Sequence, residues 1–198
     1  MKFILASNNK KKLHELREIL ADIGAEVLSQ SEAGLNLEVE ETGTTFEENA
    51  YLKAKGACDA LNLPAIADDS GLCVDVLGGA PGVYSARYGG ENCRSDDARY
   101  AYLLKNIGDA ENRTARFVSC ITCVFPNGDR ITTRGECEGE ILRAPRGEGG
   151  FGYDPVFLPL GSEKSMAELS AGEKNAISHR GRALQKFKVK LREYYADK

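Results

Sequence analysis

The sequence predicts an α/β protein in which helices flank a mixed β-sheet. In residues 1–74, short apolar runs alternate with segments of helical periodicity, an order typical of strands that are joined by helices. Residues 114–141 instead hold two strand-like runs on either side of Asn127 and Gly128, a dipeptide typical of the tight turn of an antiparallel hairpin. A sheet that combines both kinds of connection is mixed.

Local sequence signals predict the individual helices and strands. The first helix has leucines at helical spacing and ends at Gly24. The second helix has Thr44 or Thr45 as its cap, the third has Ser95 and the last has Ser178, because a hydroxyl can accept a hydrogen bond from a free N–H of the first turn. In chain order, the expected strands lie at 2–6, 25–29, 64–68, 72–77, 114–125, 129–141 and 156–158, and the expected helices at 13–23, 46–61, 95–107 and 178–195.

Length and composition predict a single cytoplasmic domain over residues 1–198. A chain of 198 residues can bury a core of its own, and no linker or repeat divides it. The net charge of −4 argues against a nucleic-acid partner, which would favour a basic face. No run approaches the roughly 18 apolar residues of a membrane span, so no membrane partner is expected. The apolar run at the N-terminus is too short for a secretory signal.

The six cysteines are expected to be small buried hydrophobic residues. Without a secretion signal, disulfides are not expected. Cys120 and Cys123 lie three residues apart in a strand-like run and therefore point to opposite faces, so they cannot share a metal ion.

Two adjacent carboxylates, Asp68 and Asp69, follow the apolar run at 63–67 and are the most informative pair in the chain. We expect them at the end of a buried strand, where α/β sheets bind ligands. Neighbouring carboxylates favour a nearby cation, which offsets their repulsion. A functional site is the favoured interpretation, and a pair that caps a turn is the alternative.

Two more charged segments lie beside expected helix starts. Residues 7–12, Ser-Asn-Asn-Lys-Lys-Lys, place backbone N–H groups and lysines where an anion can bind. Taken alone, this segment is more typical of a capped helix start with solvated lysines. The acidic residues Glu38, Glu40 and Glu41 precede the second helix, where they favour the helix dipole. One of them can also serve as an oxygen ligand of Mg²⁺.

Two segments near the C-terminus carry groups that fit a nucleotide. Residues 147–154 contain a Gly-x-Gly-x-x-Gly pattern, but Pro155 prevents a following helix, so the segment is a flexible loop rather than a dinucleotide fingerprint. Its aromatic residues, Phe151 and Tyr153, can stack on a flat ring. Residues 173–180 place cationic and hydroxyl side chains at a helix start, where they can bind an anion or simply lie at the surface.

Five sequence blocks, taken together and in order, resemble the inosine triphosphate pyrophosphatase family. They are SNNKKK, EETGTTFEENA, ADDSGLCVDVLGGAPGVYSARY, GGFGYDPVF and EKNAISHRGRAL, and they span nearly the whole chain. SNNKKK lacks the glycine that bacterial members often carry in this loop. The resemblance implies a two-lobed α/β domain around a long mixed sheet, with the active site in the cleft between the lobes. It also implies a homodimer and dependence on Mg²⁺.

The implied reaction is hydrolysis of ITP, dITP or XTP to the nucleoside monophosphate and pyrophosphate, which cleanses the nucleotide pool. The resemblance makes Asp69 the proton acceptor and, with Glu41, a metal ligand. The implied substrate-binding residues are Ser7, Asn8, Asn9, Lys10, Lys11, Lys12, Ser70, Phe151, Gly152, Tyr153, Asp154, Lys174, His179 and Arg180.

Two other functions fit parts of the pattern. A Maf-type pyrophosphatase would act on other nucleotides, and the Ser-His-Arg block at 178–180 argues against it. A nucleotide sensor would bind without turnover, and the presence of Glu41, Asp69 and the lysines at 10–12 argues against that. An assay of ITP with Mg²⁺ separates all three.

Overall fold

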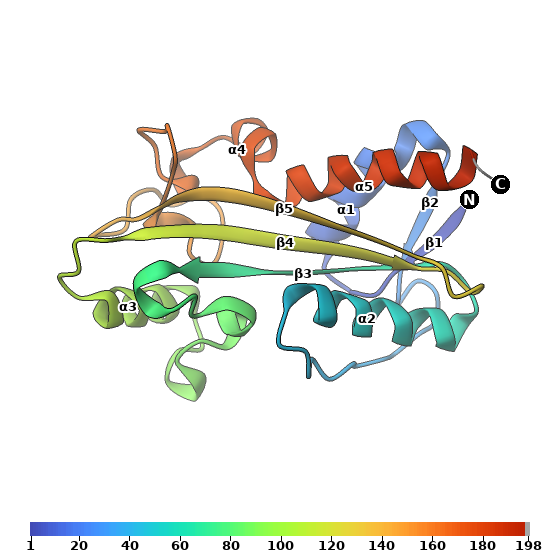
Figure 1. The fold of residues 1–198 in the computed structure, drawn as a ribbon, viewed down its shortest axis with the longest axis horizontal. Coiled ribbons are helices and arrows are strands. Elements are labelled where there is room, and N and C mark those ends of the chain that lie inside the picture. Colours follow the sequence, from blue (N-terminus) through green and yellow to red (C-terminus); the bar gives the residue numbers. More distant parts are fainter. Residues whose placement is uncertain (197–198) are drawn as a thin grey trace. The chain divides into compact units, whose positions relative to one another are not determined.

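A computed structural model of the chain describes residues 1–196, which form a six-stranded mixed sheet with helices (Figure 1). The strand order is β2-β1-β3-β4-β5-β6; β1 runs parallel to β2 and β3, whereas β5 and β6 are antiparallel. The predicted α/β class with a mixed sheet is therefore confirmed, whereas an active site in a cleft between two lobes stays a prediction. The elements are β1 (Lys2–Leu5), α1 (Lys10–Leu20), β2 (Glu26–Ser29), α2 (Phe46–Leu61), β3 (Ala65–Val74), α3 (Asp96–Ile107), β4 (Thr114–Val124), β5 (Arg130–Ile141), β6 (Phe157–Pro159), α4 (Ala171–Ile177) and α5 (His179–Ala196).

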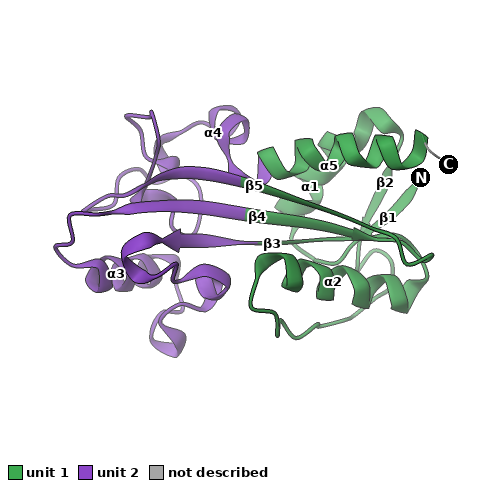
Figure 2. Ribbon diagram, viewed as in Figure 1, with its two compact units in different colours: residues 1–69, 119–135, 182–198 green, residues 70–118, 136–181 purple. Residues whose placement is uncertain are grey.

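The chain divides into two compact units (Figure 2). Unit 1 comprises residues 1–69, 119–135 and 182–198, and unit 2 comprises residues 70–118 and 136–181. The expectation of one domain over 1–198 stays a prediction.

Unit 1 has helices on both faces of its strands, with α1 and α5 on one face and α2 on the other (Figure 2). Alternation along β1 explains this arrangement, because successive side chains of a strand point to opposite faces. Phe3 and Leu5 belong to one buried cluster with residues of α1 and α5. Ile4, between them, belongs to a second cluster with Ala54 and Ala57 of α2.

Unit 2 has its own apolar core. Leu72 and Val74 of β3, Leu103 of α3, Phe117 of β4 and Phe157 of β6 lie in one buried cluster. The rings of Phe117 and Phe157 are tilted against each other with their centroids 4.5 Å apart. This core supports the pocket described below.

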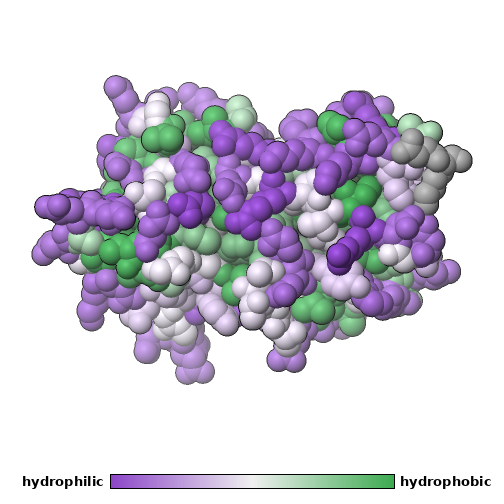
Figure 3. Space-filling model, viewed as in Figure 1, coloured by the Kyte–Doolittle hydropathy of each residue, from purple (hydrophilic) through white to green (hydrophobic). Residues whose placement is uncertain are grey.

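The surface is mostly polar on the face shown in Figure 3, where smaller apolar areas lie between hydrophilic side chains. Among residues 1–196, none of the helices combines the length and apolar character needed to cross a membrane.

The break expected after Asp68 is wrong, because β3 is one strand of 10 residues that runs through both aspartates. Ser70 and Gly71 resemble a turn in the sequence, but both are extended here. Burial of Asp68 and Asp69 inside a strand is tolerated because each carboxylate has a lysine partner. The aspartates therefore do not lie at a strand end.

Two smaller expectations also need correction. Helix α4 is not predicted by the sequence, because it has only 7 residues, too few for a clear periodicity; it begins after a capping box formed by Ser170 and Glu173. Cys73 is half-buried rather than buried, although all six cysteines are free, as expected. The hairpin turn is confirmed: Phe125 N donates to Asp129 O at 2.9 Å, and Gly128 has a φ of 89°.

Candidate functional site

Unit 1 buries a group of alternating charges, which we call the carboxylate–lysine cluster: Lys12, Glu41, Lys53, Asp68 and Asp69. Lys12 Nζ, from α1, lies 2.8 Å from Asp68 Oδ1 of β3. Lys53 Nζ, from α2, lies 2.8 Å from Glu41 Oε1 and 3.2 Å from Asp69 Oδ1. Both aspartates are only 8% exposed. A strand, two helices and the segment before α2 therefore bring three carboxylates and two ammonium groups together.

The titration of the cluster follows from its burial and its pairing. Burial raises the pKa of Asp69; Lys53 lowers it and Glu41 raises it again, so the pKa of Asp69 stays above its ordinary value. Burial lowers the pKa of Lys53, but the charges of Asp69 and Glu41 raise it by more, so the pKa of Lys53 stays above its ordinary value. Lys53 is therefore an ammonium ion at neutral pH.

Glu41 and Asp69 fit a divalent cation that arrives with a phosphate ligand. Both contact one ammonium nitrogen, so their oxygens already converge on a single positive charge. Asp69 Oδ2 is buried and has no hydrogen-bond partner among residues 1–196. Within the same residues, no three His, Cys, Asp or Glu side chains are arranged to hold a metal ion. Mg²⁺ does not need such a group, because it commonly binds one or two carboxylates plus substrate phosphates.

Residues 7–12 form a capped helix start, as the residue types predict. Asn9 Oδ1 accepts hydrogen bonds from the backbone N–H groups of Lys11 and Lys12 at 3.0 and 3.2 Å. Ser7 Oγ accepts one from Asn9 N at 3.1 Å, and Asn8 Oδ1 accepts one from Ser31 N at 3.1 Å. Two backbone amides that could bind a phosphate are thus already hydrogen-bonded to Asn9. The lysine side chains are therefore the main groups of this segment that could bind an anion.

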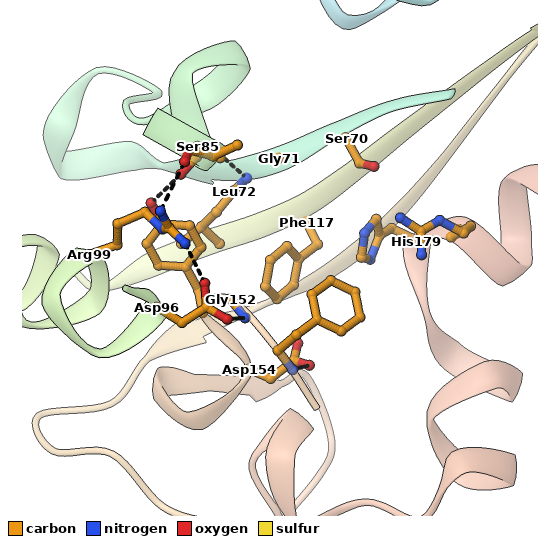
Figure 4. Close-up of a pocket in the computed structure, with 14 residues that line it drawn as sticks. Ser70, Gly71, Leu72, Ser85, Asp96, Arg99, Phe117, Gly152, Asp154 and His179 are labelled. Carbon is orange, nitrogen blue, oxygen red and sulfur yellow. Dashed lines mark hydrogen bonds and ion pairs between the residues drawn. The ribbon is translucent and has the colours of Figure 1, made fainter. Parts of the chain in front are cut away.

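Unit 2 contains a pocket of about 190 Å³ with aromatic walls (Figure 4). The ring of His179 stacks on Phe117 with centroids 4.9 Å apart and planes inclined by 15°. Phe151 lines the pocket and remains 47% exposed, so one ring is available to a ligand. The residues that line the pocket are Ser70, Gly71, Leu72, Ser85, Ala86, Asp96, Arg99, Phe117, Phe151, Gly152, Tyr153, Asp154, His179 and Arg180.

The loop that carries Phe151 is fixed by Asp154 and Lys174. Asp154 Oδ2 accepts a hydrogen bond from Phe151 N at 2.9 Å and one from Lys174 Nζ at 2.5 Å. The same ammonium lies 4.4 Å from the centroid of the Phe151 ring, in cation–π contact. Asp154 therefore joins the loop that carries Phe151 to Lys174 of α4.

The predicted site residues fall into two groups, one in each unit. In unit 1, Glu41 and Asp69 share Lys53, and Ser7 to Lys12 surround the start of α1. In unit 2, seven predicted residues line the pocket, and Lys174 contacts two of them. Those seven are Ser70, Phe151, Gly152, Tyr153, Asp154, His179 and Arg180.

Several residues of these groups were not predicted from the sequence, notably Lys53 in unit 1 and Ser85, Asp96 and Arg99 in unit 2. Lys53 had a usable signal, because it lies four residues after Asn49 beside the apolar stripe of α2 and therefore on the same side of the helix. Asn49 is fully buried. The three residues in unit 2 had no such signal, because they are far in the sequence from the other residues of the pocket and only the fold brings the first turn of α3 and Ser85 to it.

Known proteins match this chain over almost its entire length. A model of the Ham1 family matches residues 3–190. A dITP/XTP pyrophosphatase of Aquifex aeolicus (strain VF5) is 50% identical over 94% of each chain, and one of Bacillus subtilis (strain 168) is 49% identical over 92% of this chain and 93% of its own. The solved structure of the Staphylococcus aureus Ham1 protein has a TM-score of 0.92 at 43% identity, over 98% of this chain and 100% of its own.

Proposed function

The chain belongs to the Ham1 family, and on that premise we propose that it hydrolyses the non-standard purine nucleoside triphosphates dITP, ITP and XTP to the nucleoside monophosphate and pyrophosphate. The observation that carries the proposal is the 50% identity, over 94% of each chain, with a dITP/XTP pyrophosphatase. The reaction removes these nucleotides before they are incorporated into DNA or RNA. An assay that counts pyrophosphate released from dITP tests the proposal.

The pocket of unit 2 supports binding of the purine base. Phe151 offers an exposed ring face for stacking, and the stacked pair of Phe117 and His179 provides a second aromatic wall. Arg180, at the start of α5, lines the same pocket. Its guanidinium has only donors, so it favours the six-position carbonyl of hypoxanthine and xanthine over the amino group of adenine.

The N-terminal part of α1 supports binding of the triphosphate. Lys10 and Lys11 are exposed, and Lys12 is held by Asp68. These ammonium groups offset phosphate charge and hold the chain of phosphates near the carboxylate–lysine cluster of unit 1. Because the Asn9 side chain already accepts from two backbone amides, we assign phosphate contact chiefly to the lysine side chains.

Glu41 and Asp69 are the residues that would hold Mg²⁺. When bound, the ion offsets phosphate charge and lowers the pKa of a coordinated water. Asp69 then takes the proton from the attacking water as general base. Its unpaired buried oxygen, Oδ2, is the atom that we assign to this role. Lys53 contacts both Glu41 and Asp69 and so keeps their carboxylates close together.

We further propose that the protein acts as a cytoplasmic homodimer. The cytoplasmic location follows from the substrate, because nucleoside triphosphates are made and consumed there. The dimer is supported by exposed apolar side chains near one another in the sequence of unit 2. Val76 is 43% and Tyr84 58% exposed, so both side chains are available to pack against a second copy of the chain.

A further inference from the structure

Three successive residues of the loop at 147–154 are each held by a different hydrogen bond, and Figure 4 shows the one between Gly152 and Asp96. Phe151 N donates to Asp154 Oδ2 within the loop itself. Gly152 N donates to Asp96 Oδ2 at 2.7 Å, and the Tyr153 hydroxyl donates to Ser85 O at 2.7 Å. Asp96 and Ser85 lie more than 50 residues earlier in the chain, so these two contacts tie the loop to the body of unit 2.

The loop needs such contacts because its own sequence gives it little order. Gly147, Gly150 and Gly152 have φ values of 83°, 75° and 62°, a region that glycine enters freely and other residues enter rarely. A glycine-rich segment has more conformations to lose when it becomes ordered. The 47% exposure of Phe151 shows that packing alone does not fix its ring.

Asp96 is itself held rigidly. It is the first residue of α3, whose cap, Ser95, accepts a hydrogen bond from Ala98 N at 3.1 Å. Asp96 Oδ1 lies 2.6 Å from Arg99 Nη2, one turn along the helix. Arg99 Nη1 in turn donates to the Ala86 carbonyl at 3.1 Å. The Asp96 carboxylate, which accepts the hydrogen bond from the loop, is therefore held in place by α3 and by the Arg99 guanidinium.

The charge of Asp96 strengthens its bond to the loop. Burial raises the pKa of Asp96, but hydrogen bonds from Arg99 and from Gly152 N lower it by more, so its pKa lies below its ordinary value. Asp96 is therefore ionised at neutral pH, and a bond from an N–H to a carboxylate is stronger than one to a neutral acceptor.

We propose that Asp96 is a positioning residue for the purine base: by accepting the Gly152 N–H, it holds the Phe151 ring in the place where the base stacks. This inference rests on the proposed function, in which Phe151 binds the base. A binding surface that is ordered before the ligand arrives avoids the entropic cost of ordering on binding. Loss of Asp96 should therefore weaken nucleotide binding and leave the chemical step nearly unchanged.

Asp96→Ala is the direct test, and the chain offers a matched control next to it. Asp97 lies in the same first turn of α3, its carboxylate raises the pKa of Tyr100, and it is not among the residues that line the pocket. Asp97→Ala therefore removes one acidic residue from the same helix end. Asp96→Asn keeps an oxygen that can accept from Gly152 N and loses the charge that pairs with Arg99, so it should restore part of the binding.

Two measurements on the full chain decide the proposal. Hydrogen exchange without nucleotide reports the order of residues 147–154, and steady-state kinetics with dITP separates KM from kcat. We expect Asp96→Ala to speed exchange in this segment and to raise KM about tenfold with kcat within about twofold, as for a loss of uniform binding. Asp96→Asn should give an intermediate KM, and Asp97→Ala should match the parent in both measurements.

An unchanged KM or unchanged exchange in Asp96→Ala would overturn the proposal, and so would an equal effect of Asp97→Ala. If the parent protein released no pyrophosphate from dITP, the proposed function would fail, and the kinetic role of Asp96 with it. The exchange comparison would still decide whether Asp96 orders the loop, so the two failures can be told apart.

Discussion

Lys12 and Asp68 form an ion pair of 2.8 Å between the first turn of α1 and the middle of β3. Asp69, the next residue, pairs with a different lysine, Lys53. Successive side chains of a strand point to opposite faces, so the two adjacent aspartates belong to different contacts and should have different roles. We expect Asp68 to hold a lysine that binds phosphate, and Asp69 to take part in the chemistry.

Exchange of each aspartate for asparagine should separate these roles. Asp69→Asn keeps the shape but removes the proton acceptor, so kcat should fall by about 100-fold or more with the fold intact. Asp68→Asn should be milder and should act mainly on KM, because Lys12 loses its charged partner. Steady-state kinetics with dITP and circular dichroism of both variants check this. Equal losses of kcat in the two variants would contradict the division of roles.

Asp69→Asn should also make the protein more stable. A carboxyl whose pKa is raised by folding contributes stability only while it is protonated, and that contribution is lost as the pH rises through the folded-state pKa. At neutral pH the ionised Asp69 therefore destabilises the fold, whereas asparagine has no charge to bury. The melting temperature of Asp69→Asn, without metal, should exceed that of the parent at pH 7. The difference should shrink below the ordinary pKa of 3.8. A lower melting temperature at pH 7 would contradict this.

Base selectivity should depend on Arg180 and not on Phe151. Arg180→Ala removes a donor to the six-position carbonyl, so activity on ITP should fall by about 10- to 100-fold and activity on ATP much less. Phe151→Ala should lower both about equally, because either base can stack. The specificity constants, kcat/KM, for ITP and ATP measure the ratio. Arg182, two positions along, is not among the residues that line the pocket, and Arg182→Ala is the matched control. An unchanged ITP-to-ATP ratio in Arg180→Ala would place the selectivity elsewhere.

The protein should be a homodimer in solution. Light scattering should therefore give a mass of about 43 kDa, twice the 21.5 kDa of one chain. Tyr84→Asp should shift the protein towards the monomer, because a charge on an apolar contact face must be desolvated when the dimer forms. Leu160 is 83% exposed and serves as the control, since Leu160→Asp should leave the dimer intact if the contact lies around Tyr84. A mass of 21.5 kDa for the parent protein at micromolar concentration would rule out the dimer.

Much of the fold could be predicted from local sequence signals. Thr45 and Ser95 cap α2 and α3 as expected, and Asn127 and Gly128 lie in the turn between β4 and β5. The continuity of β3 could not be predicted, because the lysines that make Asp68 and Asp69 tolerable inside a strand come from two separate helices. The role of Asp96 could not be predicted either, because its partner Gly152 is 56 residues away and no sequence spacing connects the two.

The central claim, that this chain is a dITP pyrophosphatase with Asp69 in its reaction, is tested most directly by counting the phosphate products released from dITP. With Mg²⁺ present, the account predicts one pyrophosphate for each dIMP and no orthophosphate. It further predicts a much lower rate with dATP, and a loss of turnover when EDTA removes the metal or Asp69 is exchanged for asparagine. Release of orthophosphate and dIDP in place of pyrophosphate, or turnover that persists in Asp69→Asn, would contradict it.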